Sequence, residues 1–479
     1  MTGLPWFPKS SVCVEGRCVL EFGGKFDFLV IGAGQAAMPL VFDLAKAGKR
    51  VALAERKYLG GSCVNFGCTP SKAVIASARV AQLARRGAEF GLRIPTVEVD
   101  FPAVLSGARA VVMESRDGLA EEFEGIDNPL LLRGHARIEG RDTDGFRVGI
   151  GDSHVIRADQ IVLDTGTRAR IPEIEGLAGV PYITADNWID RSELPEHLIL
   201  LGGGYIGLEM GQFYRRMGSR VTIVDQGPRL MPHEEPETSE TMRRLLEAEG
   251  IAFRFDAKVT RVAGGGGVVA TVDQAGTTTE IRGSHLFVAV GRTPNTGDTG
   301  LETVGVALTS EGIVTVDKRL ATTVAGIWAV GDIRGGPMFT QTSWDDYRVL
   351  KSQLIGDGAR TTDRLVPYGV FTDPQLGRVG LTEAQARQAG KNVRVGHFDM
   401  LHNGRARESR EKNGFIKVVV DADTDRLLGA TVVSDEATEL VQIYSTLMNA
   451  DAPYSVIRDT IYIHPTYAEA VQSATEAVR

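Results

Sequence analysis

Cysteine is scarce in this sequence, with four residues in a chain of 479, and that scarcity excludes a small fold held together by disulfides. It fits a reducing cytoplasm, where we expect this protein and where a disulfide is usually catalytic. Residues 1–6 carry neither the basic nor the apolar segment of a secretory signal. No apolar run approaches the roughly 18 residues that span a bilayer, so no membrane partner is expected.

An excess of positive charge is also lacking. The formal net charge is −8, which gives no electrostatic reason to expect nucleic acid or an anionic membrane as a partner. Hydrophobic residues make up 43% and charged residues 24%, which are ordinary values for a globular protein. At about 100–200 residues per domain, the chain has room for about three domains.

Two of the four cysteines, Cys63 and Cys68, lie in the segment GGSCVNFGCTPSK at residues 60–72. The four residues between them allow a helical turn to bring both thiols within disulfide distance. The glycines that precede them would let a bound cofactor approach the backbone. One cysteine could then attack a substrate while the other exchanges electrons with the cofactor. A structural disulfide, or two buried thiols, is the alternative interpretation.

A dinucleotide-binding fingerprint precedes the cysteines, in FLVIGAGQAA at residues 28–37. A short apolar strand leads into a G-x-G-x-x-A turn and then into a helix expected over 38–47. A second strand, expected over 51–54, is followed by Glu55, which can accept hydrogen bonds from a ribose 2′-OH. The motif positions, where the backbone closes on a pyrophosphate at a helix N-terminus, are Gly32, Gly34 and Ala37.

A second fingerprint follows the cysteines, in LILLGGGYIG at residues 198–207, with Gly202, Gly204 and Gly207 at the motif positions. A helix is expected to continue over 209–217, and a strand over 221–225 ends on Asp225. An acid there can bond a free 2′-OH and repel a 2′-phosphate, which favours NADH, although the nearby Arg229 leaves NADPH as the alternative. Two cofactor sites around a cysteine pair imply electrons passing from nicotinamide to flavin to disulfide.

With these residues in this order, the chain resembles the flavoprotein disulfide reductases, the group of glutathione reductase, dihydrolipoamide dehydrogenase and mercuric reductase. The similarity runs from about Phe26 to the C-terminus. Further segments similar to the family's landmarks are Thr165-Gly166, GRTPN from Gly291, IWAVGD ending on the ribityl-binding Asp332, FTDPQ at 371–375, and HPT from His464.

The resemblance implies an α/β fold with two Rossmann-like domains, for FAD and NAD(P), and a C-terminal α+β dimerisation domain. Residues 26–160 and 291–360 would form the FAD domain, 161–290 the NAD(P) domain, and 361–479 the interface domain. Residues 1–25 would be an N-terminal extension that forms a β-hairpin. Its Cys13 and Cys18 would face each other as a cross-strand disulfide, a metal-delivering dithiol, or two small apolar residues.

Roles for the central residues follow from the resemblance and from local chemistry. Cys68, at the start of a helix that contains Pro70, would lie against the flavin, because a helix N-terminus favours the thiolate. Cys63 would be the outer thiol that attacks the substrate. Lys72 is expected to pair with Glu209 beside the flavin. Tyr205 would either cover the nicotinamide pocket, as in some relatives, or pack as an aliphatic residue does in others.

His464 is the expected acid–base residue, and Glu469, five residues on, would orient it as in the family's His-Glu dyad. An imidazole can hold the outer cysteine as thiolate and protonate a leaving thiolate near neutral pH. In the family this dyad comes from the partner subunit. The chain is therefore expected to act as a homodimer.

The implied activity is that of an FAD-dependent oxidoreductase, which passes electrons from NAD(P)H to a small disulfide, a reactive oxidant or a thiophilic metal ion. Residues 473–479 lack the terminal cysteine pair of typical mercuric reductases, and Tyr462 replaces the second histidine usual in dihydrolipoamide dehydrogenases. Residues 335–340 and 345–348 look more like the reactive-chlorine-resistance flavoproteins. No resident metal is expected. Mercuric reductase proper and dihydrolipoamide dehydrogenase remain alternatives, and the intact site residues argue against a non-catalytic flavin-binding protein.

Overall fold

The computed structural model of the chain describes residues 8–14, 17–22, 24–152 and 154–479, with the backbone alone described for residues before 24. The chain divides into two compact units. Unit 1 takes in residues up to 70, then 107–170 and 292–364. Unit 2 takes in residues 71–106, 171–291 and 365–479.

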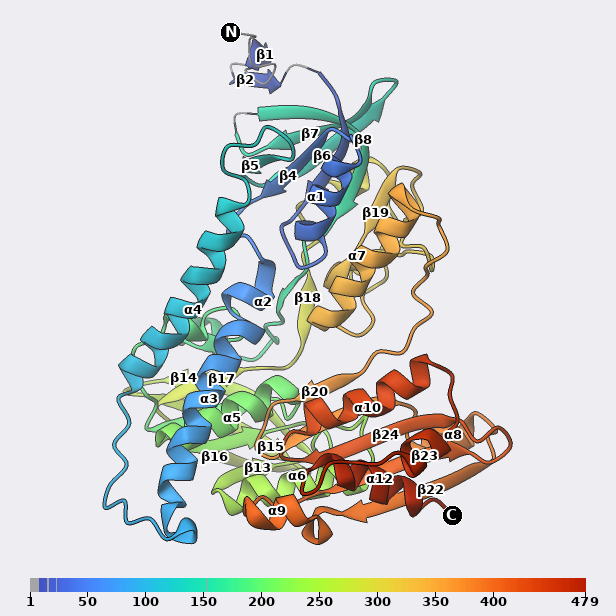
Figure 1. Ribbon diagram of the computed structural model, residues 1–479. Helices are drawn as coiled ribbons and strands as arrows, with labels where there is room; N and C mark the ends of the chain where they lie inside the picture. Colours follow the sequence, from blue (N-terminus) through green and yellow to red (C-terminus); the bar gives the residue numbers. More distant parts are fainter. Residues whose placement is uncertain (1–7, 15–16, 23, 153) are drawn as a thin grey trace. The chain divides into compact units, whose positions relative to one another are not determined.

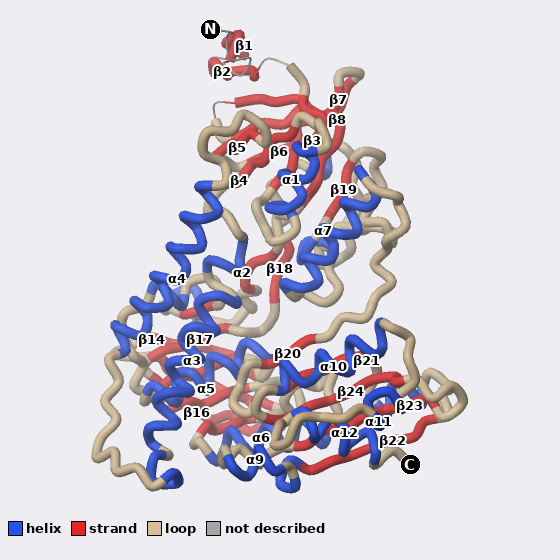
Figure 2. The backbone as a smooth tube through the Cα atoms, in the orientation of Figure 1, coloured by secondary structure: helices blue, strands red, loops and turns tan. Residues whose placement is uncertain are grey.

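Unit 1 is built on a nine-stranded sheet whose main path runs β1-β2-β8-β3-β4-β5, with β19 paired to β8 (Figures 1 and 2). Strands β3, β4, β5, β8 and β19 pair in parallel, whereas β6, β7 and β8 form an antiparallel meander. The strands are β1 (Pro8–Val14), β2 (Arg17–Phe22), β3 (Phe26–Ile31), β4 (Val51–Glu55), β5 (Leu130–Arg133), β6 (Ala136–Asp142), β7 (Gly145–Ile150), β8 (His154–Leu163) and β19 (Ile327–Ala329). A separate ribbon pairs β9 (Thr167–Ala169) with β18 (Arg292–Pro294).

The parallel strands of unit 1 are buried on both faces. All five residues of β4 are buried, and its first four form an unbroken apolar run rather than an alternating pattern, as expected of a strand covered on both faces. Helices α1 (Ala37–Lys46) and α7 (Thr340–Ile355) pack against each other. Helix α2 (Gly61–Asn65) is short, and α3 (Cys68–Arg85) and α4 (Phe101–Glu121) each continue from one unit into the other.

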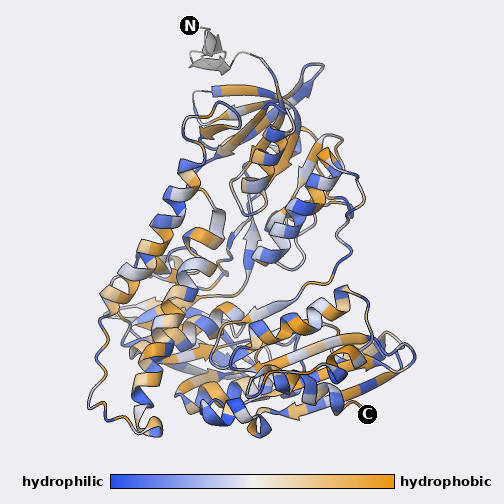
Figure 3. Cartoon of the chain, viewed as in Figure 1, coloured by the Kyte–Doolittle hydropathy of each residue, from blue (hydrophilic) through white to orange (hydrophobic). Residues whose placement is uncertain are grey.

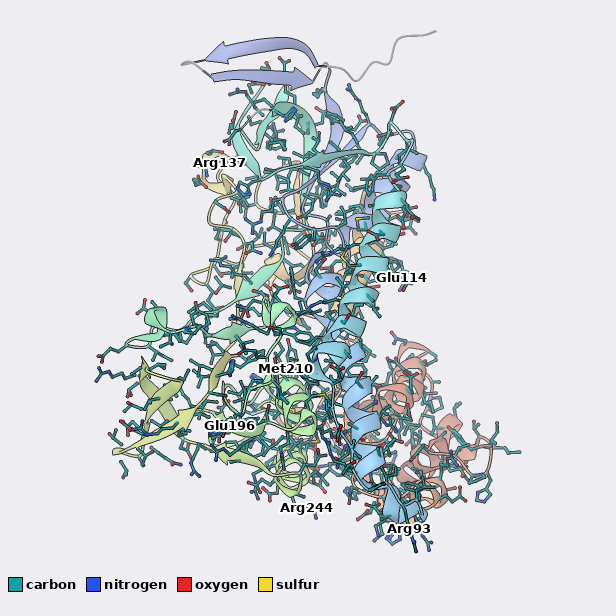
Figure 4. All side chains as sticks on the ribbon, turned by 90° about the vertical axis from the view of Figure 1, so that its left-hand side faces the viewer. Arg93, Glu114, Arg137, Glu196, Met210 and Arg244 are labelled. Carbon is teal, nitrogen blue, oxygen red and sulfur yellow. The ribbon has the colours of Figure 1, made fainter. Side chains whose placement is uncertain are left out.

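Unit 2 contains a second parallel sheet, in the order β10-β17-β11-β12-β13. Helices α5 and α6 accompany this sheet. Figure 4 labels one residue of each helix, Met210 of α5 and Arg244 of α6. An antiparallel sheet of β14, β15 and β16 follows, and its first turn is the glycine run at 264–267. The bounds are β10 (Ile183–Thr184), β11 (His197–Leu201), α5 (Tyr205–Met217), β12 (Arg220–Val224), α6 (Pro236–Ala248), β13 (Ile251–Arg254), β14 (Ala257–Gly264), β15 (Val268–Gln274), β16 (Thr277–Gly283) and β17 (His285–Val288).

The C-terminal part of unit 2 is an antiparallel sheet in the order β20-β21-β24-β23-β22. Helix α10 contacts β21 and β24, and α12 contacts β22 and β23, which closes an apolar core. Figure 3 shows many strand residues of the sheets in orange and the exposed loops largely in blue. The bounds are β20 (Tyr368–Val370), β21 (Gln375–Gly380), α8 (Glu383–Gln388), β22 (Val393–Asp399), α9 (Gly404–Glu408), β23 (Phe415–Asp421), β24 (Leu427–Ser434), α10 (Ala437–Asn449), α11 (Ser455–Asp459) and α12 (Ala468–Glu476).

The predicted fold class is confirmed, because two parallel strand–turn–helix folds and a C-terminal α+β part are present. The exact domain boundaries stay a prediction. In the N-terminal extension, β1 pairs antiparallel with β2 and the backbone of Cys13 lies opposite that of Cys18. The predicted loop at 15–16 and the side chains of these cysteines lie outside the described residues. Within the described part of the chain, no helix is long and apolar enough to cross a membrane.

Candidate active site and dinucleotide sites

The first predicted fingerprint is a tight turn between β3 and α1. Gly32 has a φ of +94°, and a Cβ there would lie 2.3 Å from the carbonyl oxygen of Asp164, so only glycine fits. The buried carboxylate of Glu55 lies at the end of β4, as predicted, and accepts hydrogen bonds from the backbone N–H groups of Ala33 (2.8 Å) and Lys57 (2.6 Å). Glu55 therefore holds the turn that leads into the start of α1, the arrangement that binds a dinucleotide.

The cysteine segment packs directly on this turn. A Cβ on Gly61 would lie 3.0 Å from the Cα of Gly34, so the glycine entry predicted from the sequence is a close backbone contact. Asn65, which is almost fully buried, donates hydrogen bonds from Nδ2 to the carbonyls of Leu59 (2.9 Å) and Gly61 (2.7 Å). These bonds hold α2, which carries the half-buried Cys63.

Cys68 is the first residue of α3, where the sequence predicts a helix start. Its side chain is exposed, and its Sγ lies 3.3 Å from the hydroxyl oxygen of Thr340, the first residue of α7. Thr340 is a neighbour of Cys68 that the sequence alone does not indicate. An isolated threonine at a helix start usually serves as a cap, so spacing alone gives no signal for this contact.

Two segments that resemble family landmarks, Thr165-Gly166 and the GRTPN segment that begins at Gly291, are hydrogen-bonded to each other in unit 1. Asn295 donates from its backbone N–H to the carbonyl of Gly166 (3.0 Å), and from Nδ2 to the carbonyl of Thr165 (2.9 Å). Strand β8 ends at Leu163, two residues before Thr165. Gly291, the last residue before this segment returns to unit 1, has a φ of +116°.

Asp332 lies in a short 3₁₀ helix, Gly331–Arg334, directly after β19. Its Oδ2 accepts a hydrogen bond from the hydroxyl of Thr167 (3.0 Å) and lies 4.0 Å from Nε of Arg292. Burial raises the pKa of the Asp332 carboxyl above its usual range, while Arg292 and Thr167 oppose that shift. The position after a parallel strand and beside the first turn fits a residue that binds a flavin dinucleotide.

The second fingerprint repeats the first in unit 2. Gly202 has a φ of +106°, and a Cβ there would lie 2.4 Å from the carbonyl oxygen of Ala289. A Cβ on Gly207 would lie 2.0 Å from the carbonyl oxygen of Gly202, whereas one on Gly204 would meet nothing within 4 Å. The open space at Gly204 leaves room for a pyrophosphate to approach the backbone. Tyr205, one-third exposed, is the first residue of α5.

Asp225 follows β12 as predicted, and both its carboxylate oxygens bind backbone. Oδ2 accepts from the N–H of Gly203 (2.5 Å) and Oδ1 from that of Gly227 (2.7 Å). Arg229, which left NADPH open as an alternative, donates from Nη2 to the carbonyls of Pro232 (3.0 Å) and Glu234 (3.3 Å). Nη2 of this guanidinium is therefore engaged by the chain itself.

Lys72 and Glu209 form the predicted pair, with 2.7 Å between Nζ and Oε2. Glu209 is buried, and its Oε1 accepts the backbone N–H of Phe371 (2.9 Å). The Lys72 ammonium also lies 4.5 Å from the centre of the Phe371 ring. These contacts fix the cation at a defined point on α3, four residues after Cys68.

The predicted His-Glu dyad is formed within unit 2. Nδ1 of His464 lies 2.9 Å from Oε1 of Glu469, and the backbone N–H of Thr466 donates to Oε2 (2.8 Å). The hydrogen bond from Thr466, followed by that from His464, holds the pKa of Glu469 below its usual range. The carboxylate therefore stays charged and orients the ring so that Nε2 is left for chemistry.

The structure thus brings together the pairs Lys72–Glu209 and His464–Glu469. Cys63 and Cys68 belong to unit 1 and the dyad to unit 2. Asp164 was not identified from the sequence, although its carboxyl lies against the first turn and its Oδ2 accepts the N–H of Ala37 (2.9 Å). The sequence feature that could have identified Asp164 is its position directly after an apolar strand.

Comparison with known proteins agrees with this geometry. Residues 26–346 match the family described as "Pyridine nucleotide-disulphide oxidoreductase", and residues 366–475 match its dimerisation domain. The chain is 32% identical to the probable pyridine nucleotide-disulfide oxidoreductase RclA of Escherichia coli, over 95% of this chain and all of that protein. It is 34% identical to the dihydrolipoyl dehydrogenase of Thermus scotoductus, over 95% of this chain and 97% of that protein.

A mercuric reductase of Streptomyces lividans is 32% identical, over 96% of this chain and 97% of that protein. Among solved structures, the Cu(II) complex of the HOCl-induced flavoprotein disulfide reductase RclA from Escherichia coli matches with a TM-score of 0.86. The match is 32% identical and covers 95% of this chain and all of the solved chain.

Proposed function

Because this chain belongs to the pyridine nucleotide-disulphide oxidoreductase family, we propose that Cys63 and Cys68 are its redox-active pair and reduce a small disulfide or reactive oxidant. The protein is an oxidoreductase, and its family uses FAD and NAD(P)H. The observation that carries the proposal is the position of the cysteines. Cys63 lies on a short helix whose first residue, Gly61, packs on the first dinucleotide turn, and Cys68 is the first residue of the next helix.

Bound FAD would supply a two-electron relay between the nicotinamide and the cysteine pair. The residues that would hold it are the turn from Gly32 to Ala37, Glu55 and Asp332. Their fit rests on the closed turn at Gly32 and on the carboxylate that holds it. Lys72, fixed by Glu209, would supply a positive charge near a ring that gains electrons.

The cysteines would act in turn. The thiolate of Cys63 attacks one sulfur of the substrate disulfide, and that S–S bond breaks. His464 gives a proton to the sulfur that leaves. The thiolate of Cys68 then attacks the sulfur of Cys63, which breaks the mixed disulfide, releases the second substrate sulfur as a thiolate and re-forms the Cys63–Cys68 disulfide. Two electrons have then passed to the substrate.

NADH is the proposed donor. Asp225 is held by two backbone N–H groups at the end of β12, where it can accept bonds from an unmodified ribose. Nη2 of Arg229 donates to the carbonyls of Pro232 and Glu234, so this nitrogen is engaged by the chain rather than offered to a 2′-phosphate. Tyr205, at the start of α5, is proposed to cover the nicotinamide.

We also propose a homodimer in which His464 and Glu469 serve the cysteines of the partner subunit. The chain carries the family's dimerisation domain. Ile461 and Ile463, on the segment that leads into His464, are 96% and 80% exposed within one chain. Two isoleucines with such exposure beside a predicted catalytic residue favour an interface in which a second copy of the chain buries them. A cytoplasmic location is part of the proposal and rests on the redox use of the cysteines.

The acceptor proposed first is a disulfide or oxidant, because His464 provides the proton that a leaving thiolate needs. A second candidate is Cu(II), since the solved relative RclA is described as an HOCl-induced flavoprotein disulfide reductase with a Cu(II) complex. Thiolates are soft ligands that suit copper, so the same cysteine pair could reduce either class.

A turnover screen with NADH tests the proposal. Rates are measured for glutathione disulfide, lipoamide, Cu(II), Hg(II) and hypothiocyanite, with the parent and Cys63→Ser at equal flavin loading. The expected result is turnover of at least one disulfide or oxidant that Cys63→Ser abolishes. Parent-level turnover of that substrate by Cys63→Ser would contradict the role of the pair.

A further inference from the structure

The two dinucleotide turns of this chain make the same backbone contacts, which identifies equivalent residues. Asp164 donates its backbone N–H to Ile31, and Ala289 donates its own to Leu201, both at 2.8 Å. The carbonyl oxygens of Asp164 and Ala289 also face the first glycine of each turn, Gly32 in one case and Gly202 in the other. Asp164 in the first turn is therefore the counterpart of Ala289 in the second.

The side chain of Asp164 makes the first turn different. A Cβ on Gly34 would lie 2.7 Å from Oδ2 of Asp164, whereas the space around Gly204 is open to 4 Å. Oδ2 also accepts the N–H of Ala37 at the start of α1 (2.9 Å). The carboxyl thus stands beside the second glycine, where a dinucleotide pyrophosphate approaches the backbone, and engages a donor of the helix start.

The surroundings of Asp164 oppose a negative charge. The residue is 6% exposed. Burial raises the pKa of the Asp164 carboxyl well above its usual range, and the carboxyls of Asp332, Asp346 and Glu55 add to that rise, while the Ala37 N–H opposes it. The neighbouring cations contact other acids: Arg334 and Arg364 bind Asp346, and Nε of Arg292 lies 4.0 Å from Oδ2 of Asp332. Among the described residues, none forms an ion pair with Asp164.

We propose that Asp164 holds the FAD site as a neutral carboxylic acid, so that retention of FAD is coupled to one proton on this side chain. The inference rests on the family's use of FAD and on the first turn as its pyrophosphate site. An ionised Asp164 would place a negative charge beside the pyrophosphate. A neutral one removes that repulsion and adds an O–H donor.

The raised pKa of Asp164 sets the direction in which FAD binding changes with pH. The protonated form is present below the folded-state pKa of Asp164 and is lost as pH rises through it, so FAD binding weakens toward alkaline pH. One coupled proton changes the FAD dissociation constant by at most about tenfold per pH unit. Replacing the carboxyl with a group that cannot ionise removes this contribution.

The test uses holoenzyme of the parent, Asp164→Asn and Asp164→Ala, the last matching Ala289. Asp159→Asn, an exposed residue of β8, the strand that Asp164 directly follows, is the matched control. Diluted holoenzyme is equilibrated between about pH 6 and 9, and free FAD is measured after ultrafiltration. The parent and Asp159→Asn should lose FAD increasingly with pH. Both Asp164 variants should show a flatter profile, with the difference from the parent approaching about tenfold per pH unit.

An infrared difference spectrum of parent holoenzyme minus Asp164→Asn at neutral pH gives a second readout. It should contain the C=O band of a protonated carboxyl. If the variants lose FAD altogether, the parent's own profile still decides, because FAD retention that is flat or rises with pH contradicts the proposal. Identical profiles for parent and Asp164→Asn, or a missing carboxyl band, would also overturn it. These outcomes leave the cysteine chemistry untouched, since neither readout depends on turnover.

Discussion

His464 and Glu469 are five residues apart, and the link between them is one hydrogen bond of 2.9 Å from Nδ1 to Oε1. Reduction of a disulfide releases a thiolate that needs a proton, whereas electron transfer to a metal ion held by thiolates has no such leaving group. His464→Ala should therefore slow disulfide reduction by about 10²–10⁴-fold and spare most Cu(II) reduction.

The measurement is the steady-state rate on one disulfide and on Cu(II), for parent and His464→Ala at equal flavin loading. Equal losses on both substrates would show that His464 does not separate the two chemistries. The proposed preference for a disulfide or oxidant would then lose its main support.

Asp225 is the second residue whose role can be measured directly. If it binds the adenosine ribose, kcat/KM should favour NADH in the parent, and Asp225→Ala should move the ratio toward NADPH. A charge-assisted hydrogen bond of about 1.5–3 kcal/mol corresponds to roughly a ten- to hundredfold change. Asp225 also holds two backbone N–H groups, so the NADH-to-NADPH ratio is the readout rather than the absolute rate. A parent enzyme that prefers NADPH would disprove the assignment.

Residues such as Cys63, Cys68 and Glu55 could be identified from the sequence because their chemistry is tied to a fixed spacing. Asp164 and Thr340 could not, because each meets its partners through the fold. Asp164 reaches Ala37 across 127 positions and Thr340 reaches Cys68 across 272. No local pattern encodes contacts of that separation, although the acid after the apolar strand β8 was a usable hint.

Helix α5 carries a row of side chains that holds the segment before β21. Glu209 accepts the N–H of Phe371, and Gln212 exchanges two hydrogen bonds with the backbone of Asp373. Arg216, 5% exposed, binds the carboxylates of Asp373 and Glu249, both at 2.7 Å. Spacings of three and four residues put these side chains on one face of the helix.

Arg216→Met should destabilise the protein strongly, because it leaves two partly buried carboxylates without their buried cation. The expected cost is about 3–5 kcal/mol. Arg243→Met on α6 is the matched control, since Arg243 also pairs with two carboxylates but is one-third exposed, and should cost less than about 1 kcal/mol. Thermal unfolding of both holoenzymes checks this, and equal melting temperatures would contradict the structural role assigned to α5.

Helices and strands can be predicted from the sequence where hydrophobic periodicity and glycine turns coincide. The helix expected over 38–47 is observed as α1 at 37–46, and the helix start predicted at Cys68 is observed as the first residue of α3. The start at Cys68 has a physical cause, because Pro70 is well suited to the first turn of a helix. The segment between α3 and α4 shows neither the helical nor the strand periodicity of apolar residues, so no element is predicted there.

At the scale of the whole molecule, the exposed isoleucines beside the dyad are the basis of a prediction about assembly. Ile461→Asp with Ile463→Asp should weaken the homodimer and lower disulfide reduction, since the dyad is proposed to act on the partner subunit. Leu308→Asp, at an apolar residue 42% exposed in unit 1, is the control. Light scattering after size-exclusion chromatography gives the mass. A double variant with the parent's mass and rate would refute the shared site.

The central claim is that electrons from the nicotinamide reach the Cys63–Cys68 pair, and counting thiols tests it most directly. Oxidised holoenzyme is treated with NADH without oxygen, denatured in acid to stop exchange, and alkylated. The parent should gain two alkylated cysteines, identified by mass spectrometry as Cys63 and Cys68, over the untreated enzyme. Cys68→Ser, which cannot form the disulfide, should show no gain at Cys63. A parent whose Cys63 and Cys68 are equally alkylated with and without NADH would contradict the account.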